Sequence, residues 1–138
     1  MFNKALKPSD LTAQCNHTLV SNLGIEFTEI NEDYITAKMP VDQRTFQPFG
    51  LLHGGASMAL AETLGSIASH LITDPDRSVC VGMEINGNHI RPVSSGWVTG
   101  VVKPVHIGKK SHIWEIRINN PDNKLVCISR LTMAVIDK

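Results

Sequence analysis

The spacing of hydrophobic residues along the chain predicts two helices and six strands. The longest helical pattern covers residues 54–72, where one face carries Leu60, Leu64, Ile67 and Leu71. A shorter helix is expected from Ser9 or Asp10, either of which can cap it, to about residue 21. Runs rich in β-branched and alternating apolar residues predict strands at 25–30, 34–40, 78–90, 96–107, 111–119 and 124–136.

Short polar connections join these elements, which favours a mostly antiparallel sheet. Residues 31–33, Asn-Glu-Asp, are typical of a hairpin turn, and Pro48 and Gly50 keep the loop after residue 40 irregular. No helix separates the last four strands, so neighbouring strands there can pair through simple turns. We therefore expect one α+β domain over residues 1–138, with the long helix packed on the sheet or wrapped by it.

Composition excludes several classes of protein. The chain has 13 basic and 13 acidic side chains, and a net charge of zero disfavours nucleic acid as a partner. The three cysteines are far apart, which is typical of buried thiols in a reducing compartment. The sequence begins without an apolar signal segment and has no run long enough to cross a bilayer. We therefore expect a cytoplasmic protein with no membrane partner.

The sequence lacks the usual metal and nucleotide motifs. There is no HExxH, no paired His/Cys spacing and no GxGxxG. Residues 55–59, GASMA, lack the final glycine of the GxSxG motif, which makes Ser57 a helix residue rather than a nucleophile. We expect no metal and no redox cofactor, and chemistry of the hydrolytic or proton-transfer kind.

Glu62 is the one charged residue between positions 50 and 72. A surface helix normally has a charged outer face, whereas the face around Glu62 is small or uncharged at Met58, Gly65, Ser66 and Ser69. Both faces of the helix are thus expected to be covered, one by the sheet and the other by a second body, although an exposed groove also fits. A lone carboxylate in this place suits a general base or a nucleophile, and a structural glutamate bonded to Ser66 is the alternative.

Residues 53–55, His-Gly-Gly, begin the long helix without an expected side-chain cap. Free N–H groups at a helix start can bind an anion or a developing oxyanion, although the glycines could simply allow a tight turn. Gly55 and Glu62 are seven residues apart, about 10 Å along the axis, so one carbonyl cannot easily contact both. Two antiparallel copies of the helix would bring them together. We therefore expect a two-fold dimer with composite sites.

Charge is unevenly distributed along the chain. Residues 1–90 hold 5 basic and 10 acidic side chains, whereas residues 91–138 hold 8 basic and 3 acidic ones. The basic part includes the turn at 106–111, HIGKKS, whose donors suit a phosphate, although it lacks P-loop spacing. A solvated charged turn is the alternative.

Residues 47–69, QPFGLLHGGASMALAETLGSIAS, resemble the signature of hotdog-fold acyl-CoA thioesterases. The resemblance extends to MPVDQRT before this segment and to GMEINGNHIR, KPVHIGKK and SRLTMAV after it. It is strongest for the branch that acts on aromatic thioesters in menaquinone and enterobactin synthesis. It implies a long helix wrapped by an antiparallel sheet, a homodimer often doubled to a tetramer, and hydrolysis of a 1,4-dihydroxy-2-naphthoyl-CoA or hydroxybenzoyl-type thioester.

The same resemblance implies roles for individual residues. Glu62 matches the nucleophile or general base, the Gly55 N–H would polarise the thioester carbonyl, and Ser66 would help to position the attacking water. The side chains that would orient the thioester are His53 and Gln47. Contacts to CoA are expected from Gly82, His89, Arg91, His106, Gly108, Lys109, Lys110 and Ser111. The acyl pocket is expected to use residues near the motif, namely Phe49, Leu52 and Met58.

Three other functions fit the sequence. A hotdog hydratase or dehydratase would act on the α and β carbons of an acyl chain and release no thiol. A CoA-binding module would bind CoA without turnover. A thioesterase could also act on acyl groups held by a carrier protein instead of CoA.

Overall fold

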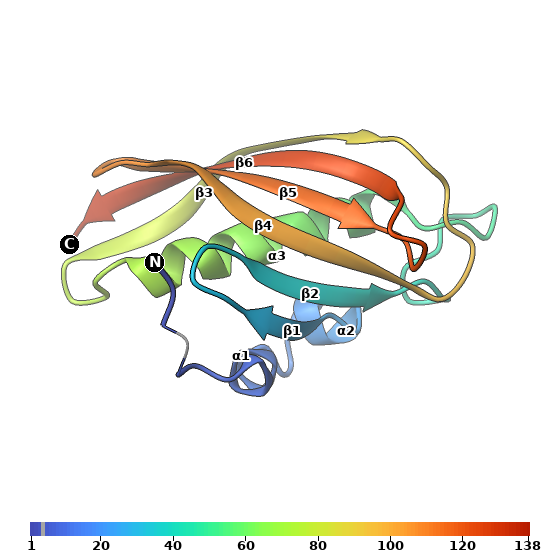
Figure 1. Cartoon of the computed structure of the whole chain (residues 1–138), viewed down its shortest axis with the longest axis horizontal. Coiled ribbons are helices and arrows are strands. Elements are labelled where there is room, and N and C mark those ends of the chain that lie inside the picture. Colours follow the sequence, from blue (N-terminus) through green and yellow to red (C-terminus); the bar gives the residue numbers. More distant parts are fainter. Residues whose placement is uncertain (4) are drawn as a thin grey trace.

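The computed structural model describes residues 1–3 and 5–138, and its centre is a six-stranded sheet with the long helix α3 across one face (Figure 1). The strands pair antiparallel throughout, in the order β1-β2-β4-β5-β6-β3. They are β1 (Glu26–Ile30), β2 (Ile35–Pro40), β3 (Ser78–His89), β4 (Trp97–Ile107), β5 (Ser111–Asn119) and β6 (Leu125–Asp137). The predicted strand bounds differ from these by one residue at most, and the predicted α+β class is confirmed.

Helix α3 (Gly54–Ile72) has the predicted bounds and carries its apolar face into the core. Leu60 and Leu64 have no exposed surface and belong to one cluster with the inward side chains of the sheet. The helix lies very close to the strands, because a Cβ on Gly100 of β4 would come within 2.6 Å of a Leu64 methyl carbon. The prediction that Gly65 and Ser69 lie on the outer face is wrong, since both are buried against the sheet.

The predicted first helix is divided in two. Helix α1 (Pro8–Gln14) begins after Lys7 without a side-chain cap, so the expected cap from Ser9 or Asp10 is wrong. Helix α2 (Leu19–Asn22) begins after Thr18, whose side chain accepts a hydrogen bond from the Val20 N–H at 3.2 Å. His17 between them has a φ of 62°, a left-handed conformation that no continuous helix accommodates. Local capping at Thr18 therefore outweighs helix propensity across this segment.

Strand β3 lies at an edge of the sheet and is paired on one side only, with β6. The strand also exposes apolar side chains, with Val79 at 39%, Val81 at 44% and Met83 at 66% of their surface accessible. The pairing with β6 is irregular between Gly82 and Glu84. A long edge strand with exposed apolar residues offers unpaired backbone groups to another chain.

Two expectations about the environment of the chain can be compared with the structure. The cysteines Cys15, Cys80 and Cys127 are free and buried, as predicted. Among the helices of the described residues, none is both long and apolar enough to cross a membrane.

Candidate active site

The start of α3 is capped by His53, which corrects the prediction of an uncapped helix. The Gly55 N–H donates to His53 Nδ1 at 2.7 Å, so this donor is already engaged within the chain. The His53 carbonyl accepts from the Ala56 and Ser57 N–H groups at 3.0 and 3.2 Å. Because Nδ1 is an acceptor, a neutral His53 ring carries its proton on Nε2 and presents it outward as a donor. The cap was missed because histidine is not among the usual capping residues.

Gly54 supplies the N–H group at this helix start that has no partner within the described chain. Glycine at this position also lets neighbouring groups come close, since a Cβ would lie 2.7 Å from His89 Nε2. The dipole of the 19-residue helix places partial positive charge at the same end. The chemistry expected of the Gly55 N–H is therefore available at Gly54 instead.

Gln47 is held by a compact loop that turns back at Gly50, whose φ is 76°. The Gln47 N–H donates to the Leu51 carbonyl at 2.8 Å, and Phe46 and Leu52 form an isolated bridge across the loop. The side-chain oxygen of Gln47 accepts from the Phe49 N–H, which leaves the two amide hydrogens free to donate. Gln47 and Gly54 thus present N–H donors to one cavity.

This cavity has a volume of about 300 Å³ and is lined by both exposed polar and buried apolar residues. Its exposed rim carries the His89 ring and the cationic Arg91, and one guanidinium nitrogen of Arg91 donates to the Leu125 carbonyl at 2.6 Å. The buried part of its wall is formed by Ser57 and Val126, and the lining residues Leu51 and Leu52 are partly buried. A ligand with an anionic end and an apolar end would therefore fit in one orientation.

Glu62 lies on a different side of α3, beneath the edge strand β3. Its carboxylate packs against Gly82, where a Cβ would lie 2.6 Å from Oε1. The Ser66 hydroxyl is 3.5 Å from the same oxygen, which is long for a hydrogen bond and leaves the carboxylate loosely held. Glu62 is half-buried, so water reaches it within one chain. Gly82, expected to contact CoA, is thus next to the predicted catalytic carboxylate.

The helix start and Glu62 do not form one site within a chain. Gly54 and Glu62 are eight positions apart, which corresponds to about 12 Å along the axis. Glu62 is also absent from the lining of the cavity at Gln47 and Gly54. As the sequence predicted, one substrate carbonyl cannot contact both the helix start and Glu62 of the same chain.

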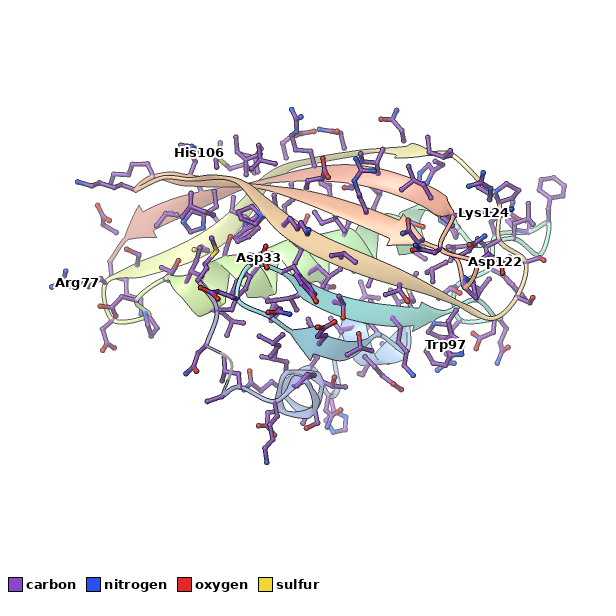
Figure 2. All side chains as sticks on the ribbon, in the orientation of Figure 1. Asp33, Arg77, Trp97, His106, Asp122 and Lys124 are labelled. Atoms are coloured by element: carbon purple, nitrogen blue, oxygen red, sulfur yellow. The ribbon has the colours of Figure 1, made fainter. Side chains whose placement is uncertain are left out.

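The turn at residues 106–111 lies at the opposite end of the sheet from His89. Ser111 pairs with Ala134, which pairs with Val81, and Val81 lies about 25 Å along β3 from His89. In Figure 2, His106 lies toward the end of the sheet that is away from Lys124. The predicted CoA contacts are therefore divided between two distant regions of one chain.

Within this turn, Lys110 binds Asp137 at 2.5 Å, and the lysine lowers the pKa of that carboxyl. Gly108 donates to the Ser111 carbonyl at 2.9 Å and lies against the His106 ring. Lys109 is exposed and has no ion pair within the described residues. Lys109 is thus the lysine of the turn that is available to an anion.

The residues expected to line the acyl pocket are scattered. Leu52 lines the cavity, whereas Phe49 is 88% exposed and Met58 packs against Gly87 of β3. A second hollow of about 280 Å³ lies on the outer side of the helix start, beside His53 and Gly55. Its remaining wall is mainly apolar and includes Leu19, Leu23, Phe46, Ala56 and Ala59.

Sequence reasoning also missed a buried polar cluster near the other end of α3. The Ser69 hydroxyl accepts from Trp114 Nε1 at 2.7 Å and lies 3.0 Å from His112 Nδ1. Since the indole can only donate, the Ser69 hydrogen is free to point at Nδ1. Burial, and secondly the charge of His106, lowers the pKa of His112. The alternation of His112 and Trp114 in a strand was the available signal, but their shared partner was not visible in the sequence.

Comparison with known proteins gives consistent matches over nearly the whole chain. A proofreading thioesterase, EntH, from Cronobacter turicensis is 53% identical over 91% of each chain. The 1,4-dihydroxy-2-naphthoyl-CoA hydrolase of Escherichia coli is 48% identical over 91% of this chain and 92% of its own. The crystal structure of a mutant thioesterase from Pseudomonas aeruginosa has a TM-score of 0.96 and 46% identity, over 99% of both chains.

The profile of the thioesterase superfamily matches residues 49–127, more than half of the chain. That segment contains Glu62, the helix start and strand β3, which carries both Gly82 and His89. These findings confirm the resemblance seen in the sequence and the hotdog architecture of the sheet and helix. The chain belongs to the thioesterase superfamily and is a hotdog-fold thioester hydrolase.

Proposed function

We propose that this protein hydrolyses an aromatic acyl-CoA thioester, of the 1,4-dihydroxy-2-naphthoyl or hydroxybenzoyl type, to the free acid and CoA. The observation that carries the proposal is the cavity at the start of α3, which joins two free N–H donors to an apolar interior and a cationic rim. The E. coli relative is named for a bicyclic aromatic ester of CoA, which supports the acyl class and a step in menaquinone synthesis.

The helix start binds the thioester carbonyl in this proposal. The Gly54 N–H and the Gln47 amide donate to the carbonyl oxygen and stabilise the negative charge that develops there. Gly54 replaces Gly55 as the polarising donor, because the Gly55 N–H is bonded to His53. The His53 Nε2–H, fixed by that bond, orients the substrate from the other side.

Glu62 supplies the second half of the chemistry. As a general base it takes a proton from water, whose oxygen forms the new C–O bond while the C–S bond breaks and the thiolate leaves. As a nucleophile it would form a mixed anhydride, which water then hydrolyses. Ser66, within 3.5 Å of the carboxylate, positions the water in either case. The proposed reaction uses no metal or redox cofactor, and CoA enters as part of the substrate.

A two-fold dimer would assemble these halves. The open backbone edge of β3, together with the exposed apolar side chains Val79, Val81 and Met83 on this strand, supports pairing with a second copy of the chain. Two antiparallel α3 helices would then bring Glu62 of one chain to Gly54 and Gln47 of the other. The same rotation would carry the partner's basic turn toward the rim at His89 and Arg91, where it would meet the CoA phosphates. Two such dimers would form the tetramer that the resemblance implies.

The proposal also includes the cellular compartment and the group that carries the acyl chain, CoA or a carrier protein. Three buried free cysteines support a reducing compartment, and we place the reaction in the cytoplasm. CoA is favoured over a carrier protein because the basic rim matches its phosphates.

A thiol-release assay tests the activity. Wild type and Glu62→Ala are compared on 1,4-dihydroxy-2-naphthoyl-CoA, hydroxybenzoyl-CoA, aliphatic CoA esters and an aryl-loaded carrier protein. We expect release from the aromatic CoA esters by wild type alone, while Glu62→Ala still binds CoA in calorimetry. Absence of release from every ester would contradict the proposal and favour a dehydratase or a binding module.

Complementation tests the composite site. Glu62→Ala and Gln47→Ala chains are each expected to be inactive. A dimer containing one of each retains one intact site, so refolding them together should restore about a quarter of the wild-type activity. No recovery in a mixture shown to contain heterodimers would rule out sites shared between chains.

A further inference from the structure

Ser57 is a buried hydroxyl that the proposed chemistry does not use. It lies one turn into α3, with 1% of its surface exposed, and its side chain forms no hydrogen bond with the described chain. The other hydroxyls of this helix all have partners: Thr63 donates to the Ala59 carbonyl, Ser66 contacts Glu62, and Ser69 joins Trp114 and His112. The residue is thus almost completely buried, yet its hydroxyl has no protein partner, which calls for an explanation.

The small exposed part of Ser57 faces the cavity at the helix start. Among the described residues, no side-chain nitrogen or oxygen that is fully shielded from solvent lacks a hydrogen-bond partner. The Ser57 oxygen has no partner, so it must be the atom that retains the exposure. Since Ser57 lines the cavity, this oxygen is open to whatever occupies the cavity.

We infer that Ser57 is a specificity residue whose hydroxyl binds an oxygen substituent on the aromatic ring of the acyl group. The inference rests on the proposed function and on which side of the cavity is open to solvent. The pantetheine arm and charged phosphates of CoA must leave the cavity through its exposed side, past His89 and Arg91, which leaves the buried wall to the acyl group. At that wall, Ser57 is the one polar side chain beside Val126 and Leu52.

The spacing along the helix favours a hydroxyl on the ring carbon next to the acyl carbon. Ser57 lies three residues from Gly54, about 4.5 Å along the axis and close to the same face. If the Gly54 N–H binds the thioester carbonyl, an adjacent ring hydroxyl is the substituent nearest to that oxygen. A serine hydroxyl can both donate to and accept from a phenol, so it can bind the ring hydroxyl whichever way the phenolic O–H points.

The experiment compares 2-hydroxybenzoyl-CoA with benzoyl-CoA in wild type and Ser57→Ala. The quantity of interest is the ratio of the two kcat/KM values, because the intrinsic reactivities of the two esters cancel between the enzymes. Loss of one neutral hydrogen bond corresponds to about a tenfold fall in the preference for the hydroxylated ester. We expect that fall in Ser57→Ala, and recovery of most of the preference in Ser57→Thr.

Two outcomes would overturn the inference. An unchanged ratio would show that Ser57 does not contact the ring substituent. An equal loss on both esters would place Ser57 at the thioester, at CoA or in a purely structural role. Turnover of the esters by wild type keeps the proposed function intact in both cases, so the two failures are distinguishable.

Melting temperature provides the matched control. Ser57→Ala removes a hydroxyl without partners and is expected to melt at or above the wild-type temperature. Ser69→Ala, on the same helix, removes a hydroxyl bonded to Trp114 and His112 and is expected to melt lower. A lower melting temperature for Ser57→Ala would show that its hydroxyl has a structural partner, which contradicts the inference.

Discussion

Gly82→Ala tests whether the position of the Glu62 carboxylate matters for catalysis. A Cβ at Gly82 would lie 2.6 Å from Glu62 Oε1, whereas ordinary contacts begin at 3.4 Å. The carboxylate must therefore retreat by about 0.8 Å, and its long contact with Ser66 offers little resistance. A misplacement of about 1 Å at a reacting group can cost about 10²-fold in rate, roughly 2.7 kcal/mol of transition-state stabilisation.

The expected result is a fall in kcat of about 10²-fold in a thiol-release assay, with little change in the affinity for CoA. Stability should be retained, because alanine is favoured over glycine in a strand by about 0.5–1 kcal/mol. Gly87→Ala is the matched control on the same strand. There the new methyl would meet the flexible end of the Met58 side chain, which can move aside.

Sedimentation velocity on both variants shows whether either substitution changes the assembly, since Gly82 lies on the open edge strand. The reasoning fails if Gly82→Ala keeps the wild-type kcat. It also fails if Gly87→Ala loses as much activity at an unchanged oligomeric state.

Two further predictions concern other regions. Burial lowers the pKa of His112, so the folded state favours the neutral ring. The free energy of unfolding is therefore unaffected by this group above the unfolded pKa of about 6.5, and it decreases as the pH falls from there toward the lower folded pKa. His112→Asn keeps an acceptor for Ser69 but does not titrate. The melting temperature of this variant should therefore fall less between pH 7.5 and pH 5.5 than that of the wild type; an identical fall in the two proteins would refute this. Lys109→Ala should raise KM for a CoA thioester more than for the N-acetylcysteamine thioester, which lacks phosphates, and equal effects on both would exclude the turn from phosphate binding.

Secondary structure was well predicted where its signals are local. The bounds of α3 follow from an apolar period of 3.6 that is preceded by His-Gly-Gly and ends before Thr73. The break between α1 and α2 was also encoded locally, in the capping box of Thr18 and Ser21. It was missed because helix propensity was given more weight than this cap.

Prediction of the candidate site was incomplete because several of its groups depend on contacts that sequence spacing does not reveal. The sequence indicated Glu62, Gln47 and the glycines as chemically important residues. It could not show that the Gly55 N–H is occupied by His53 while the Gly54 N–H is free. Which N–H group of the first helical turn is bonded to a capping side chain depends on the rotamer of that side chain, and the order of residues does not specify the rotamer.

The sequence by itself determined the six strands, the long helix, the fold class and the family, because periodicity, turns and motifs are properties of neighbouring residues. Only the tertiary structure decided which elements meet: β3 pairs with β6 at an edge, and Gly82 thereby lies against Glu62. Only the tertiary structure left the Ser57 hydroxyl without a protein partner at the wall of the cavity, while Ser69 has two partners. The physical reason is that burial and hydrogen-bond satisfaction arise from packing between segments far apart in the chain, where each group competes for the partners that the fold brings to it.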